Sequence, residues 1–334
     1  MTRFILHVGP HKTGTSYLQE AFAQMRPLLA GRGVHYPAVW GRSAHHALLD
    51  LLRAGPDPRL EQHFAEMRAA GHDAVLISVE GLTTLPRPAV EYLRTLIGPE
   101  NPVRVVFYAR SWADRLPSHW KQATREGATE SLPEYLYRRI AQPAGSRLVN
   151  FGTGLRTYTE VFGMAALAVV AYDRVMAERR DLFAHFSASF LDWPDPPAVV
   201  QPHVNVSPDV ADIEVIRALN AIEQARRGRP ADRAAAATMS ARYLRRADAL
   251  AGPLLRDALA AHTATALLNE TSVQLAALHR ELFAEFGGAL VAPKSDGVFF
   301  APRRAEIRYV QRDYLLAPGV AEALHAVHRA VAGA

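Results

Sequence analysis

The chain has 334 residues, of which 49% are hydrophobic, so it can bury a sizeable core and is not intrinsically disordered. It has no cysteine, which excludes disulfides, thiolate metal sites and cysteine nucleophiles and favours a reducing, cytoplasmic compartment. Lysine and arginine number 38 against 33 acidic residues, and the net charge of +5 suits an anionic ligand without requiring nucleic acid. No stretch reaches about 18 apolar residues, so we expect no membrane span, and the apolar run 4–8 is too short for a signal peptide.

The first half of the chain alternates short apolar runs with segments of helical periodicity. Strands are predicted over 3–8, 74–78, 103–108 and 167–172. Helices are predicted over 16–25, 45–53, 60–70, 90–96, 112–125, 134–140, 155–162 and 180–190. Strands that alternate with helices are typical of an α/β fold with a parallel sheet covered on both faces.

The composition changes after Trp193, where prolines interrupt the chain and an alanine- and arginine-rich, mostly helical region follows. The sequence therefore predicts an α/β core over 1–207 and a mainly helical C-terminal extension over 208–334. No strand is expected within 234–286, whereas 299–316 reads as irregular or β.

The first predicted strand runs into a loop with the sequence GPHKTGTS, and a helix follows. Gly9 and Gly14 stand where a P-loop has its two glycines, and Ser16 stands where it has Ser or Thr. A strand, a glycine-rich loop and a helix N-terminus together direct backbone N–H groups at an anion. A nucleotide triphosphatase has lysine directly after the second glycine, but here that position is Thr15 and the loop lysine is Lys12.

This loop resembles the 5′-phosphosulfate loop of sulfotransferases that use 3′-phosphoadenosine-5′-phosphosulfate (PAPS), in their bacterial form. The resemblance implies a P-loop NTPase-like sulfotransferase fold, and PAPS as the cofactor, with adenosine 3′,5′-bisphosphate as product. It also implies that the loop residues hold the 5′-phosphate and the sulfate: His11, Lys12, Thr13, Gly14, Thr15 and Ser16. His11 either touches the sulfate or shapes the turn.

Arg110 follows the third predicted strand, and Ser118 comes eight residues later. An arginine at a strand end can bind a phosphate with two hydrogen bonds. The same family has an Arg and a Ser at this spacing, which implies that they bind the 3′-phosphate. The segment 155–175 is also similar to the family's helix, strand and acidic turn, and the resemblance extends over about residues 3–220.

The segment HVNVS, at 203–207, is similar to the family's loop at the adenosine end of the cofactor, which implies contacts from Asn205 and Ser207. A simple turn before the helix that follows Pro208 is the alternative interpretation of these two residues.

Sulfuryl transfer needs a cation near the leaving oxygen and a base near the acceptor. Lys12 can be the cation, and no metal is required. For the base we favour Glu80, which follows the second predicted strand, because ligands of parallel sheets bind at the carboxyl ends of the strands. His45 and His46 are the competing candidates, and Glu80 could instead anchor its loop.

The sequence thus predicts a sulfotransferase that acts on a carbohydrate, a glycolipid or a small alcohol. A P-loop kinase of small molecules is the first alternative. A basic nucleic-acid-binding protein is the second, but the arginine-rich C-terminal half lacks the interleaved aromatic residues of nucleic-acid readers.

Overall fold

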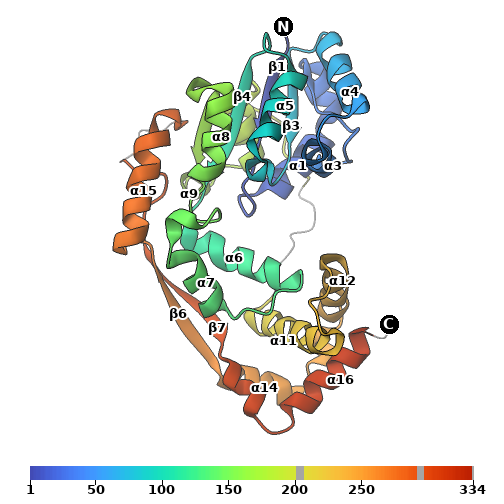
Figure 1. The fold of residues 1–334 in the computed structure, drawn as a ribbon, viewed down its shortest axis with the longest axis vertical. Helices are drawn as coiled ribbons and strands as arrows, with labels where there is room; N and C mark the ends of the chain where they lie inside the picture. Colours follow the sequence, from blue (N-terminus) through green and yellow to red (C-terminus); the bar gives the residue numbers. More distant parts are fainter. Residues whose placement is uncertain (201–206, 292–296, 333–334) are drawn as a thin grey trace. The chain divides into compact units, whose positions relative to one another are not determined.

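The computed structural model describes residues 1–200, 207–291 and 297–332, and the chain divides into two compact units (Figure 1). The first, the sheet unit, comprises 1–111, 144–204 and 275–301. The second, the helical unit, comprises 112–143, 205–274 and 302–334. This division differs from the single boundary at residue 207 that the sequence predicts, because segment 112–143 groups with C-terminal residues and 275–301 groups with the sheet.

The sheet unit contains a five-stranded parallel sheet in the order β2-β3-β1-β4-β5. Its strands are β1 (Arg3–His7), β2 (Val34–His35), β3 (Ala74–Ser78), β4 (Val103–Ala109) and β5 (Leu167–Ala171). The four predicted strands are confirmed, and so is the α/β class. The sequence missed β2, which is too short to show a periodicity.

Helices cover both faces of this sheet, as its strands of buried residues require. They are α1 (Thr15–Gln24), α2 (Arg26–Gly31), α3 (His46–Ala54), α4 (Pro58–Ala69), α5 (Arg87–Ile97), α8 (Gly152–Phe162), α9 (Tyr172–Ala177) and α10 (Leu182–Phe190), with α15 (Val273–Phe286) joining from Leu275 onward. On one face, Ile5 of β1 belongs to an apolar cluster with Phe22 of α1 and Phe186 of α10. On the other face, Phe4 stacks on Phe64 of α4. Alternate residues of β1 thus build two separate layers of core.

The helical unit contains seven helices and a two-stranded antiparallel sheet among its described residues. The helices are α6 (Trp112–Arg125), α7 (Leu132–Ile140), α11 (Val210–Arg227), α12 (Arg233–Leu244), α13 (Ala247–Leu250), α14 (Pro253–Ala261) and α16 (Val320–Ala332). The strands are β6 (Thr263–Asn269) and β7 (Arg304–Val310), which pair from Thr263 opposite Val310 to Asn269 opposite Arg304.

The expectation of no strand within 234–286 is wrong, because β6 lies inside that range. Its sequence, TATALLN, carries no turn signal and continues the alanine-rich composition of the preceding helices. Only its pairing with the distant β7 makes it a strand. The β interpretation of 299–316 is confirmed by β7 itself. None of the described helices is both long enough and apolar enough to cross a membrane.

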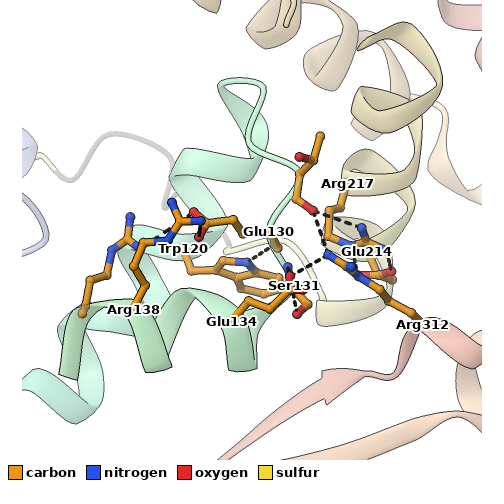
Figure 2. A network of polar contacts seen from close by, with 10 residues as sticks. Trp120, Glu130, Ser131, Glu134, Arg138, Glu214, Arg217 and Arg312 are labelled. Atoms are coloured by element: carbon orange, nitrogen blue, oxygen red, sulfur yellow. Dashed lines mark hydrogen bonds and ion pairs between the residues drawn. The ribbon is translucent and has the colours of Figure 1, made fainter. Parts of the chain in front are cut away.

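A polar network holds α6, α7 and α11 of the helical unit together (Figure 2). Its centre is a buried ion pair between Glu214 and Arg217 of α11, whose Nε and Oε2 atoms lie 2.8 Å apart. Arg217 also donates to the Thr129 carbonyl at 3.1 Å. Ser131 and Glu134 form a capping box at the start of α7. The network therefore fixes the loop before α7 against α11.

Replacing Glu214 with alanine should destabilise the helical unit by about 3–5 kcal/mol, because the Arg217 guanidinium would remain buried without its counter-ion. The matched control is Asp114→Ala, which removes the exposed ion pair with Arg303 and should cost no more than about 1 kcal/mol. Urea unfolding of both variants measures the two values. Equal losses of unfolding free energy in the two variants would show that the buried ion pair contributes no more to stability than the exposed one.

Candidate functional site

The loop between β1 and α1 has the strand-loop-helix geometry that the sequence predicts. The backbone has positive φ at Gly9 (96°), Lys12 (71°) and Gly14 (72°). Gly14 is the N-cap of α1, and a Cβ atom there would lie only 2.4 Å from Cδ2 of Leu182. Glycine adopts this conformation without strain, and any other residue there would also require the Leu182 side chain to shift. The loop brings backbone N–H groups to the N-terminus of a ten-residue helix, an arrangement that attracts anions.

The threonine side chains of the loop brace it from within. The hydroxyls of Thr13 and Thr15 both donate to the Pro10 carbonyl, at 2.7 and 3.0 Å, and both residues are buried. In this arrangement, any contact of these two residues with an anion would come from the backbone N–H groups. Ser16, in contrast, is exposed at the start of α1.

Arg110 follows β4 directly and lies against the loop between β1 and α1. Its Nη1 donates to the Lys12 carbonyl, and its guanidinium lies 5.1 Å from the centre of the Tyr172 ring. Its Nε is buried and has no hydrogen-bond partner among the residues that the structure describes. Arg110 thus presents a buried, unsatisfied donor beside the loop, which is a costly arrangement in the absence of an acceptor.

Asp173, at the start of α9, connects the ends of β4 and β5. Its carboxylate accepts a hydrogen bond of 2.7 Å from the Ser111 backbone N–H, next to Arg110. The sequence placed this residue in an acidic turn but did not reveal its role. The only sign of this role in the sequence is an acidic residue two positions after β5. The contact of Asp173 with Ser111 forms because β4 and β5 are paired.

Glu80 and His11 are in direct contact at the carboxyl ends of β3 and β1. Oε2 of Glu80 lies 2.6 Å from Nδ1 of His11, and 34% of the His11 side chain is exposed against 15% for Glu80. Burial raises the pKa of the Glu80 carboxyl. The contact with His11 and the nearby side chains of His46 and Lys12 outweigh burial, so that this pKa lies below its ordinary value.

The turn after Glu80 is held by α8. The Tyr158 hydroxyl donates to the Leu82 carbonyl at 3.0 Å, and Gly154 approaches Thr83 so closely that a Cβ atom would lie 2.5 Å from its carbonyl oxygen. Gly81 has a φ of 89°, which glycine adopts without strain. These contacts fix the backbone that carries the Glu80 side chain.

His45, one of the alternative bases, is fully buried. Its Nε2 lies 2.7 Å from the Pro37 carbonyl oxygen, and its Nδ1 accepts from the Ser78 N–H at 3.2 Å. Both ring nitrogens are therefore occupied, and burial lowers the pKa of His45 to about 4. These contacts fit a structural role between β3 and the start of α3, and the assignment of His45 as a base stays a prediction. His46, in contrast, is exposed, and its assignment as a base stays a prediction.

The other predicted nucleotide contacts lie in different parts of the chain. Ser118 is half-buried on α6 and belongs to the helical unit, whereas Arg110 belongs to the sheet unit. Ser207 also belongs to the helical unit, is exposed, and lies 3.4 Å from Nζ of Lys121. Asn205 lies outside the described residues. The assignments of Ser118, Asn205 and Ser207 stay predictions.

Within the described part of the chain, no group of three or more His, Asp and Glu side chains is arranged to hold a metal ion. Comparison with protein-family models, with curated proteins and with solved structures found no match to the chain.

Proposed function

We propose that the chain transfers a sulfuryl group from PAPS to an acceptor hydroxyl or amine. The observation that carries the proposal is the placement of Arg110 against the loop that contains Lys12, with a buried Nε that has no partner among the described residues. A bound phosphate or sulfate would satisfy such a donor with a charge-assisted hydrogen bond. The loop itself is a strand-to-helix turn of the kind that binds anions.

The residues at the loop fit PAPS in type and in position. The backbone N–H groups of the loop and the α1 dipole suit the 5′-phosphosulfate, and Arg110 suits a phosphate. When bound, PAPS supplies the sulfuryl group and a nucleotide that leaves readily. Lys12 supplies the fixed positive charge that stabilises the leaving oxygen.

The position of the lysine argues for this reaction over phosphoryl transfer. A P-loop kinase places lysine after the second glycine, where it reaches the β- and γ-phosphates, and holds Mg²⁺ with a hydroxyl and an aspartate. Here the residue after Gly14 is Thr15, so the loop lacks that lysine, although Ser16 stands at the position of the Mg²⁺-binding hydroxyl. The carboxylate nearest in sequence to the end of β3 is Glu80, which is paired with His11.

Arg110→Ala should weaken binding of adenosine 3′,5′-bisphosphate by roughly tenfold to a hundredfold, as expected for the loss of a hydrogen bond to a charged group. Adenosine 5′-phosphosulfate, which has no 3′-phosphate, should be affected much less. Arg104→Ala is the matched control, because Arg104 is an exposed arginine of β4, the strand that Arg110 follows. Calorimetry with both nucleotides measures the ratio, and equal weakening of the two would refute the 3′-phosphate assignment.

The acceptor class is tested by incubating the protein with ³⁵S-labelled PAPS and a panel of carbohydrates, glycolipids and small alcohols. We expect label to move to at least one of these classes.

A further inference from the structure

We propose that His11 accepts the proton of the attacking group and that Glu80 is the positioning residue that holds its ring. This inference rests on the proposed sulfuryl transfer, and it differs from the sequence-based prediction, in which Glu80 is the base and His11 belongs to the phosphate loop.

The 2.6 Å contact between Nδ1 of His11 and Oε2 of Glu80 favours one tautomer of His11. A carboxylate can only accept a hydrogen bond, so Glu80 favours a proton on Nδ1, although the ring in this structure is not aligned for a hydrogen bond to Oε2. In a neutral ring, the proton on Nδ1 leaves the lone pair on Nε2. Gly81 lies beside this second nitrogen, since a Cβ atom built on Gly81 would be 3.9 Å from Nε2. A residue without a side chain thus borders the nitrogen that would receive a proton.

The two partners differ in the properties that a base needs. The Glu80 side chain is less exposed than that of His11, and its carboxyl is already engaged by the ring. A general base works best when its pKa is near the working pH, and the ordinary pKa of an imidazole lies closer to neutral pH than that of a carboxyl. The turn after Glu80 is also fixed by Tyr158, which suits a residue that orients another.

The proposed step balances as follows in atoms and charge. The acceptor oxygen forms its bond to sulfur, and its proton moves to Nε2 of His11. The bond between sulfur and the bridging oxygen breaks, and its electron pair stays on the 5′-phosphate of the nucleotide, where Lys12 stabilises the added charge. His11 becomes an imidazolium, and the Glu80 carboxylate stabilises that positive charge.

Nitrogen-15 NMR of the nucleotide-free protein tests the pairing without any turnover. We expect the Nδ1–H tautomer of His11 in the wild-type protein and a mixture of tautomers in Glu80→Gln, because an amide can donate as well as accept. A purely steric contact would leave the tautomer unchanged in the variant. The Nε2–H tautomer in the wild-type protein would overturn the proposal.

Release of labelled sulfate from ³⁵S-labelled PAPS, with water as acceptor, tests the base. His11→Ala should lower the rate by about a hundredfold to ten-thousandfold, and added imidazole should restore part of it. His11→Gln, which keeps a hydrogen-bonding side chain beside Glu80, should be equally slow and checks that the loss is not one of folding. An exposed histidine of α16 provides the control, and His325→Ala should stay near wild-type activity.

Glu80→Gln should be less damaging than His11→Ala, and the double variant should be no slower than His11→Ala alone, since the two residues act as one unit. If Glu80→Gln is as slow as His11→Ala and imidazole restores neither, Glu80 is the base and the proposal is wrong. If the wild-type protein neither binds adenosine 3′,5′-bisphosphate nor releases sulfate, the proposed function fails. In that case the NMR measurement of the His11 tautomer still tests whether Glu80 orients the His11 ring, because it requires no turnover.

Discussion

Lys12→Ala is expected to lower sulfuryl transfer by at least about a hundredfold, which is the usual cost of losing one stabiliser of developing charge. The backbone should keep its conformation. Lys12 has a φ of 71°, and alanine meets the same steric cost there as any other residue with a Cβ atom. Arg110 donates to the carbonyl of residue 12, which the substitution retains. The variant should therefore lose its rate and not its fold.

Lys12→Arg is the control, because it keeps the charge on a side chain of different shape and should retain more activity than Lys12→Ala. Transfer rates with labelled PAPS, together with thermal unfolding of both variants, separate catalysis from stability. A Lys12→Ala protein within a few-fold of wild-type activity would remove this lysine from the mechanism.

Acidification below about pH 6.5 is expected to destabilise the sheet unit strongly. The cause is a set of buried histidines whose pKa values burial lowers to about 4: His7, His45, His185 and His279. All four are at most 3% exposed. Two of them accept backbone hydrogen bonds, His45 from Ser78 and His279 from Phe299, which requires neutral rings. Protonation would break these bonds.

Proton linkage gives the direction in which stability changes with pH. Between pH 6.5 and about 4 the unfolded chain binds more protons at these rings than the folded chain, so stability falls as the pH falls. A pKa difference of 2–3 units corresponds to about 3 kcal/mol for each ring, so together the four can offset a stability of about 5–15 kcal/mol.

Urea unfolding between pH 7.5 and 5 measures this loss. His279→Gln should lower the number of protons taken up on unfolding, which is obtained from the slope of the unfolding free energy against pH, by up to about one. The reason is that the amide oxygen can still accept the hydrogen bond from the Phe299 N–H without titrating. The exposed His46 serves as control, and His46→Ala should keep the wild-type slope. Stability that stays constant from pH 7.5 to 5 would contradict a neutral, buried state for these rings.

The sequence predicted the elements whose patterns are local. The apolar runs of β1, β3, β4 and β5 and the glycine-rich turn after β1 are visible residue by residue. By contrast, β6 becomes a strand only through its pairing with β7, and the composition of its own segment favours a helix. The grouping of 275–301 with the sheet likewise depends on contacts such as that of Phe151 with Phe299.

In the candidate site, too, the sequence revealed single residues but not the contacts between distant segments. The loop lysine and Arg110 could be selected from their positions after strands. The contact of His11 with Glu80 could not, because it requires β1 and β3 to be neighbours in the register that pairs His7 with Ser78. His45 and His46 look equivalent in the sequence, but one is buried between two backbone partners and the other is exposed.

The most direct test of the account is a calorimetric titration of the wild-type protein with adenosine 3′,5′-bisphosphate, with ATP plus Mg²⁺, and with a duplex oligonucleotide. We expect the bisphosphate to bind most tightly, because the loop around Lys12 lacks the lysine after Gly14 that a nucleoside triphosphate needs. Tighter binding of ATP with Mg²⁺ would favour a kinase. Binding of the duplex alone would favour the nucleic-acid alternative, and either result would contradict the proposed sulfuryl transfer.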